Sequence, residues 1–166
     1  ITYHSVIYPC SSLSTEELKI ASLFANSLTN IGLNNMNYEE VQKMQAAITG
    51  GISSNFILLP NSNNNEHNLA LKITSKSLEK NVNKMQDILI KTVSDADFTD
   101  KSRIKDLLNF VASDSEKSII QNGHILAMSN AAAQVNNIAA TNDITSGLNF
   151  ITNTSNLSKT IDQNNN

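Results

Sequence analysis

The sequence contains too little cysteine for several common kinds of site. Only one of the 166 residues is cysteine, Cys10, so an internal disulfide is impossible. A cysteine nucleophile would need a histidine beside it. The nearest one in sequence is His4, on the same predicted strand, where residues six apart share a face but lie too far apart to touch. We therefore expect no catalytic cysteine–histidine pair.

Positive charge and long apolar runs are also scarce. Lysine and arginine number 12 against 15 aspartate and glutamate, which gives a net charge of −3, and the basic residues are scattered. This distribution disfavours nucleic-acid binding, which usually leaves a basic patch. No apolar run approaches the roughly 18 residues of a membrane span, and no targeting signal is visible at the N-terminus. We expect neither a nucleic-acid partner nor a membrane span.

The composition favours one folded domain. Hydrophobic residues make up 40% of the chain and charged residues 16%, which is enough apolar material for a core. Asparagine is concentrated in NSNNNEHN (61–68) and in the final DQNNN, which we interpret as a solvated loop and a tail. We assign residues 1–160 to a single domain and 161–166 to a disordered tail.

Three segments have the pattern of β-strands. Residues 1–8 are rich in β-branched and aromatic side chains, and Pro9 is expected to end this strand, which we predict at a sheet edge. Residues 52–59 form the second strand, which Pro60 closes. Apolar and polar residues alternate in NLALKITS (68–75), which predicts a half-buried strand and hairpin partner for the second.

The first predicted helix follows the first strand. Ser14 and Glu17 have the spacing of a capping box, and Gly32 occupies the place of a helix C-cap. The residues between them divide into two faces. The apolar stripe is Ile20, Phe24, Leu28 and Ile31, and the opposite side carries Lys19, Ser22, Asn26 and Asn30.

Further helices are predicted along the rest of the chain. One covers 38–48 with Asn37 as its N-cap, and another carries apolar residues at helical spacing between 78 and 93. From Thr99 onward the sequence is helical in character, including HILAMSNAAAQV and a shorter helix DITSGLNFI that Asp143 begins. This order favours an α+β, helix-rich fold: a small antiparallel or mixed sheet with helices packed on one face. Because nothing past Leu157 has the pattern of a strand, we expect an incomplete fragment with a short, exposed sheet.

The residues that bind metals or phosphate do not form a recognisable set. None of His4, His67 and His124 has another ligand type four residues further on, as a zinc pair on a helix would. TGGISS (49–54) precedes a strand, whereas a phosphate loop precedes a helix, so a turn is predicted there. SDADFTD (94–100) lacks the glycine and glutamate of a calcium loop, and its aspartates are expected to cap a helix.

Four successive segments carry a family resemblance. They are LKIASLFANSLTNIG, NYEEVQKMQAAITGGISSNF, KSLEKNVNKMQDILIKTVSDADFTDKSRIKDLL and SIIQNGHILAMSNAAA. Their order, the helix–TGGIS–strand junction and the DF-T-D approach to a long helix resemble the pitrilysin/insulinase-type zinc metallopeptidases. The resemblance runs from Tyr3 to about Leu157. It is to the third of four homologous domains in the branch of presequence protease and falcilysin.

The resemblance implies that this domain has lost a metal site. In the family's first domain, H-x-x-E-H on the first helix binds zinc and polarises a water, and a glutamate from a later helix is the third ligand. Aligned with that helix, this chain has Ser22, Ala25 and Asn26 at the His, Glu and His positions. Residues 107–113 (LLNFVAS) offer no carboxylate. The resemblance therefore implies no catalytic residue, no metal and no cofactor in this chain, with zinc in the parent enzyme's catalytic domain.

The function implied by the resemblance is structural. The domain would form part of the wall of a chamber in which unfolded peptides, such as transit peptides or globin fragments, are degraded. Its partners would be the catalytic N-terminal half and the fourth domain of the same protein, together with the peptide substrates. The implied location is an organelle: a mitochondrion, a plastid or apicoplast, or a food vacuole. SSNF (53–56) corresponds to a substrate-pairing strand of the sister domain, but no substrate-binding role is assigned to it.

Two other classes of protein remain open. The first is a scaffold or interaction domain of the same fold with no protease role, as in the core subunits of respiratory complexes. The second is a stand-alone helical surface protein unrelated to peptidases. An upstream H-x-x-E-H motif in the full-length protein would favour the metallopeptidase, and a degenerate one would favour the scaffold.

Overall fold

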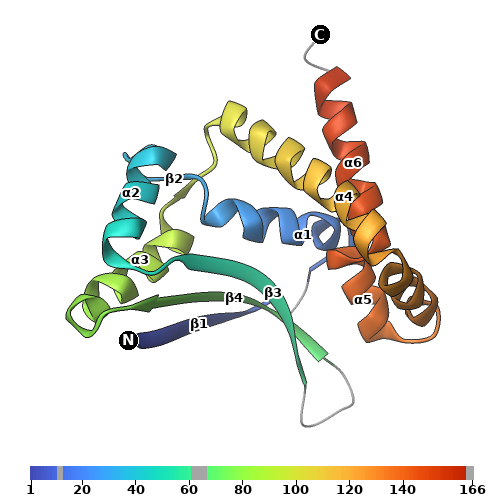
Figure 1. Cartoon of the computed structure of the whole chain (residues 1–166), viewed down its shortest axis with the longest axis horizontal. Coiled ribbons are helices and arrows are strands. Elements are labelled where there is room, and N and C mark those ends of the chain that lie inside the picture. Colours follow the sequence, from blue (N-terminus) through green and yellow to red (C-terminus); the bar gives the residue numbers. More distant parts are fainter. Residues whose placement is uncertain (11–12, 61–66, 164–166) are drawn as a thin grey trace. The chain divides into compact units, whose positions relative to one another are not determined.

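The computed structural model of the chain describes residues 1–10, 13–60 and 67–163. Contacts divide the chain into two compact units (Figure 1). Unit 1 comprises Ile1–Ser11 and Phe24–Ile104, and unit 2 comprises Ser12–Leu23 and Lys105–Asn166. The boundary passes through helix α1 (Thr15–Leu28). The assignment of residues 1–160 to a single domain stays a prediction beside this division.

Unit 1 is built on a three-stranded antiparallel sheet (Figure 1). Strands β1 (Thr2–Cys10) and β3 (Ile52–Pro60) lie at its edges, and β4 (His67–Ser77) lies between them. The predicted hairpin is confirmed, because β3 and β4 pair along their whole lengths. The predicted edge position of the first strand is also confirmed.

Pro9 does not end the first strand, as the sequence suggested. It lies inside β1 opposite Ala70, and the strand continues to Cys10. A proline has no N–H to donate to the sheet, but an edge strand needs hydrogen bonds on one side only. The edge position of β1 therefore removes the reason for the strand to stop at this residue.

The helices of unit 1 pack on one face of this sheet. Helix α3 (Val82–Ser94) lies against β4 and β1, and α2 (Tyr38–Ile48) packs beside α3. The alternation in β4 turns Leu71 and Ile73 toward the helices. The buried core cluster consists of Ala25, Leu28, Leu71, Ile73, Met85 and Leu89. This arrangement confirms the predicted α+β class with a small antiparallel sheet and helices on one face.

Helix α2 begins where the sequence predicts. The side chain of Asn37 accepts a hydrogen bond from the backbone N–H of Glu40 at 3.0 Å, and the Glu40 carboxylate accepts one from the N–H of Asn37 at 3.0 Å. This reciprocal pair is a capping box, which satisfies two of the N–H groups that have no partner within the helix. The predicted N-cap is therefore confirmed.

A second, two-stranded sheet consists of β2 (Gly32–Leu33) and β5 (Ala96–Asp97). Gly32 is therefore not the C-cap of the first helix, which ends four residues earlier at Leu28. A Cβ at this position would come within 2.6 Å of the Met36 carbonyl oxygen. The close return of the backbone at Met36, rather than a helix end, accounts for this glycine.

Unit 2 is helical. Helix α4 (Lys101–Ala133) enters it from unit 1 and departs from helical geometry at Asn122, which has φ −119° and ψ 15°. The two helical segments predicted on either side of this point are thus parts of one kinked helix. Helices α5 (Asn137–Ser146) and α6 (Leu148–Gln163) follow. Helix α6 includes the first three residues of the predicted tail, 161–163, and 164–166 lie outside the described residues.

Asp143 does not begin a helix, contrary to the sequence prediction. It lies in the last turns of α5 and is 1% exposed. Its carboxylate accepts hydrogen bonds from the backbone N–H of Leu148 at 2.9 Å and from the side-chain amides of Asn130 and Asn149. The side chain does cap a helix, but it caps α6 from the preceding helix, across the junction at Gly147.

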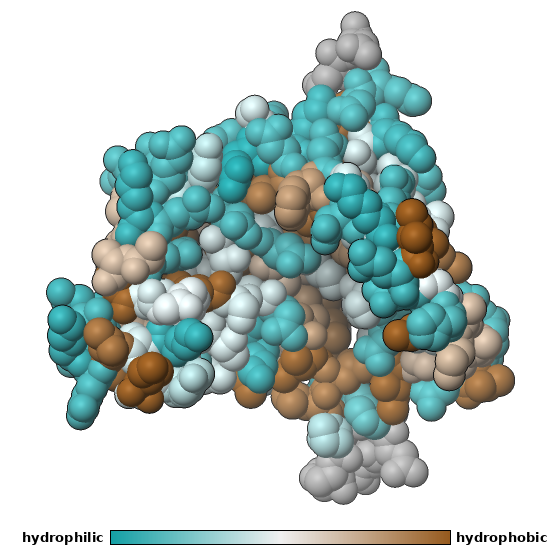
Figure 2. All heavy atoms as spheres, in the orientation of Figure 1, coloured by the Kyte–Doolittle hydropathy of each residue, from teal (hydrophilic) through white to brown (hydrophobic). Residues whose placement is uncertain are grey.

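Large apolar side chains of unit 2 reach the surface. Along α4 they include Phe110, Met128 and Ile120, which is 89% exposed. Figure 2 shows brown side chains over these helices among the hydrophilic ones. Across the part of the chain that the structure describes, no helix combines the length and the hydropathy needed to cross a membrane.

Replacing Asp143 by alanine is expected to lower the free energy of unfolding by at least about 2 kcal/mol, because three buried donors lose their acceptor. Chemical denaturation of the 166-residue chain measures this loss. Asp114, an exposed aspartate of α4, provides the control, and Asp114→Ala should change stability by less than about 0.5 kcal/mol. Equal effects of the two substitutions would contradict the capping role of Asp143.

Candidate functional site

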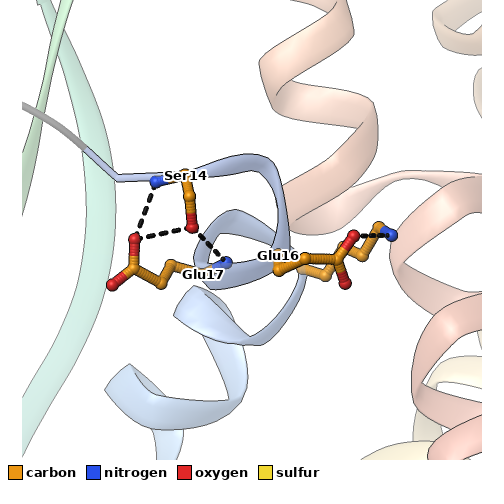
Figure 3. Close-up of polar contacts among 4 residues, drawn as sticks. Ser14, Glu16 and Glu17 are labelled. Carbon is orange, nitrogen blue, oxygen red and sulfur yellow. Dashed lines mark hydrogen bonds and ion pairs between the residues drawn. The ribbon is translucent and has the colours of Figure 1, made fainter.

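The candidate site lies on α1, the helix that aligns with the zinc-binding helix of the sister domain. The predicted capping box at its start is confirmed (Figure 3). The backbone N–H of Ser14 donates to Glu17 Oε2 at 2.7 Å, and the N–H of Glu17 donates to Ser14 Oγ at 3.3 Å. The hydrogen bond from the Ser14 hydroxyl, followed by that from its backbone, lowers the pKa of the Glu17 carboxyl. The start of α1 is therefore determined by local sequence.

The buried face of α1 differs from the predicted apolar stripe. Leu28 and Ile31 are buried as expected, but Ile20 is 50% exposed and Phe24 is 39% exposed. Ala21 and Ala25 are buried in their place, with Ala25 only 1% exposed. Since successive residues are about 100° apart around a helix, Ala21, Ala25 and Leu28 form one contiguous face. The prediction was wrong in orientation because it ranked side chains by hydrophobicity, and alanine scores low.

Phe24 makes a different contact from the one predicted. Its ring stacks on that of Phe98, with 5.6 Å between the ring centroids and 13° between the planes. Close by, the Arg103 guanidinium lies 4.0 Å above the Tyr38 ring, and its Nε donates to the Asn30 carbonyl oxygen at 3.0 Å. These contacts join the end of α1 to the starts of α2 and α4 within unit 1.

The three degenerate ligand positions lie in different environments along α1. Ser22 is half-buried, Ala25 is buried and Asn26 is exposed. Ser22 and Asn26 are four residues apart and share one side of the helix, whereas Ala25 belongs to the core cluster on β4 and α3. Zinc is bound by cysteine, histidine, aspartate or glutamate. None of these three residues supplies such a ligand, and Ala25 has no group that can act as a base.

The other candidate residues are dispersed. Within residues 107–113 of α4, Leu108 and Ala112 are buried, and none of the seven is a carboxylate. Among the described residues, no three histidine, cysteine, aspartate or glutamate side chains are grouped so as to hold a metal. His4 Nδ1 lies 3.4 Å from the Gln86 side-chain amide, and the other two histidines, on β4 and α4, are exposed.

The aspartates and glycines have the structural roles that the sequence predicts. Asp100 Oδ1 accepts from the backbone N–H of Arg103 at 2.9 Å and caps the start of α4. Asp97 Oδ1 accepts from the N–H of Thr99 at 2.8 Å, and the hydrogen bonding from Thr99 lowers the pKa of its carboxyl. Gly51 has φ +106°, as the predicted turn before β3 requires.

The sequence analysis missed a pocket at one end of the three-stranded sheet. Its side chains come from Tyr3, Ser53, Thr74 and Lys76, on all three strands. The alternation of the strands predicts that each of these residues faces away from the helices. Only the strand register brings them together, and no local pattern in the sequence specifies that register.

A family model matches residues 1–157, and its description is that of a peptidase-associated domain, in subfamily C of metallopeptidase family 16. The chain belongs to this family. Mitochondrial presequence protease of Drosophila melanogaster is 29% identical over 136 residues, covering 81% of this chain and 13% of its own length. That of Saccharomyces cerevisiae is 28% identical over 127 residues, covering 76% and 13%. Protein HypA of Clostridium perfringens is 26% identical over 151 residues, covering 90% and 16%.

These matches confirm the resemblance to the presequence protease branch. They also show that the chain spans only 13% to 16% of the length of these relatives. The homology supports a non-catalytic, peptidase-associated domain, and the relatives carry most of their length outside the matched region.

Ala25→Glu should lower the free energy of unfolding by at least about 3 kcal/mol at about pH 8, because it places an unpaired carboxylate in the core. Burial would raise the pKa of that carboxyl, so the new side chain is neutral at low pH. The loss should therefore shrink as pH falls toward about 4. Asn26→Glu, one residue further on the exposed side, is the control. Denaturation showing equal losses in both variants would mean that residue 25 does not face the core.

Glu17→Gln should remove part of the acid sensitivity of the chain. A lowered folded-state pKa means that the stabilisation is fully present above the ordinary value of 4.5 and is lost as pH falls through the folded pKa. The difference in thermal midpoint between wild type and Glu17→Gln should therefore be positive at about pH 7 and shrink toward about pH 3. Glu79→Gln, which alters an exposed glutamate with no such bond, should show no comparable trend. A difference independent of pH would contradict this role.

Proposed function

We propose that the chain is a non-catalytic structural domain of a zinc metalloendopeptidase that degrades unfolded peptides. The observation that carries the proposal is the family match over residues 1–157, shared with presequence proteases of two organisms. The composition of α1 supports it, since Ser22, Ala25 and Asn26 offer none of the side chains that bind zinc. In this proposal the zinc belongs to the catalytic domain of the parent protein.

The proposed role is to form part of the wall of a closed peptide chamber. The partners are then the catalytic N-terminal half and the fourth domain of the same protein, and the unfolded peptides enclosed by the assembled enzyme. The length of the relatives supports this, because the matched region is only 13% to 16% of each. The name of the relatives favours cleaved presequences as substrates and a mitochondrion or similar organelle as the location. Globin fragments are a second substrate class in a food vacuole.

Two measurements test this proposal. The purified 166-residue chain should hold no stoichiometric zinc and should not hydrolyse an unstructured peptide. The full-length protein that carries this domain should hydrolyse the same peptide, and a chelator should stop it. One tightly held zinc per isolated chain, with chelator-sensitive hydrolysis, would overturn the non-catalytic role. A full-length protein with no peptidase activity would replace the proposal by a scaffold of the same fold.

A further inference from the structure

The face of the three-stranded sheet that points away from the helices holds a pocket at the end near Gly50 and Gly51. Its volume is about 320 Å³, which is at the small end of the range for ligand pockets. The backbone of the two glycines forms one side, and the side chains that line it are polar. A volume of this size suits one small chemical group rather than a nucleotide or a cofactor.

The polar groups of the pocket are hydrogen-bond donors that lack acceptors within the described chain. Ser53 and Thr74 lie opposite one another in the sheet, with their hydroxyl oxygens 2.6 Å apart. One hydroxyl donates to the other, so the accepting hydroxyl keeps its own hydrogen for a further acceptor. Among the described residues, no carboxylate lies within 4.0 Å of the Lys76 ammonium. The pocket therefore offers one positive charge and at least one free hydroxyl hydrogen.

The position of Lys76 depends on the glycine beside it. The backbone N–H of Gly50 donates to the Lys76 carbonyl oxygen at 2.7 Å, which holds the turn against the strand. A Cβ at residue 50 would lie 2.9 Å from Lys76 Cε and 3.0 Å from Lys76 Cγ. The alkyl chain of the lysine thus lies along the turn, in space that any other residue at position 50 would need.

The charge of this face is opposite to that of the chain. Every second residue of β1, β3 and β4 points to it, and the described positions include Lys72 and Lys76 but no aspartate or glutamate. The whole chain carries 15 acidic against 12 basic residues. Because nothing negative among these positions competes for the lysines, an incoming anion meets a uniformly positive surface.

The same face becomes apolar away from the pocket. Ile7 lies opposite Lys72, and Ile57 lies opposite Ala70. Ala70 is four residues along β4 from Thr74, which corresponds to about 13 Å in a strand. An extended peptide with an anionic group in the pocket can therefore place an apolar side chain on Ile57 about four residues away.

We infer that this pocket binds a carboxylate of an extended peptide segment whose apolar side chain, about four residues away, packs near Ile7 and Ile57. A carboxylate has one charge and two acceptor oxygens, which match one ammonium and a free hydroxyl hydrogen. The carboxylate can belong to an acidic side chain or to a peptide C-terminus. This inference rests on the pocket and the sheet face and does not depend on the proposed peptidase role.

The test uses the 166-residue chain and short labelled peptides, with binding followed by fluorescence anisotropy. The first peptide has leucine, three serines and a terminal glutamate, with both ends blocked. The second replaces the glutamate by glutamine, and the third ends in alanine with a free C-terminal carboxylate. The first should bind at least about fivefold more tightly than the second, because only the first brings a charged acceptor. The third distinguishes a C-terminal carboxylate from an acidic side chain.

Variants of the chain locate the binding. Lys76→Gln and Thr74→Val should each weaken the binding of the glutamate peptide by at least about fivefold, since each removes a donor from the pocket. Lys80→Gln removes the same charge from an exposed position outside the strands and should change it by less than about twofold. Thermal melts of all three variants confirm that they remain folded, and either pocket variant alone suffices if the other does not fold.

Three results would overturn the inference. The first is equal binding of the glutamate and glutamine peptides, or no binding of either carboxylate peptide. The second is equal weakening by Lys76→Gln and Lys80→Gln, which would mean attraction by charge without a site. The third is displacement of the peptide by inorganic phosphate at lower concentration than by acetate, which would make the pocket a phosphate site.

Discussion

Unit 1 depends on one packing contact, between helices α1 and α3 and the helix-facing side of strand β4. Leu71 and Ile73 of the central strand meet Met85 and Leu89 of α3, and Ala25 and Leu28 of α1 complete the cluster. Burying a leucine, isoleucine or methionine contributes roughly 1.5–3 kcal/mol each, so these few side chains supply a large part of the stability of the unit. Because β4 pairs with β1 on one side and β3 on the other, the same contact also holds the sheet against its helices.

This contact limits what α1 can do. A helix that presents metal ligands and a base must hold them where a water molecule and a substrate can reach. In this chain the residue at the position of the base is Ala25, which faces the core cluster. Structural packing and catalysis would thus compete for one side of the helix, and here the residues serve packing. The family match and the geometry of α1 therefore agree on a structural role.

The two faces of the sheet are specialised in opposite ways. The helix-facing side is apolar and buried, whereas the other side carries two lysines, several hydroxyls and a few partly exposed apolar residues. A face with only positive charge in a chain of net charge −3 is suited to an acidic partner more than to solvent alone. The Gly50–Gly51 turn that begins β3 also shapes the pocket on this side, so one local feature serves both the fold and the surface.

The sequence by itself determined the features that depend on near neighbours. The capping pairs Ser14–Glu17 and Asn37–Glu40, the turn at Gly51 and the alternation in β4 all follow from residues within a few positions of one another. The lack of zinc ligands at Ser22, Ala25 and Asn26 is likewise a matter of residue identity.

Tertiary structure decided the features whose partners are distant in sequence. The buried face of α1 depends on which side meets β4, the place of Pro9 on β1 being an edge strand, and the role of Asp143 on Asn130 and on the start of α6. The pocket requires β1, β3 and β4 in one register before Tyr3, Ser53 and Lys76 come together. Local patterns predict which residues share a face of an element, but only packing between elements selects the face that is buried.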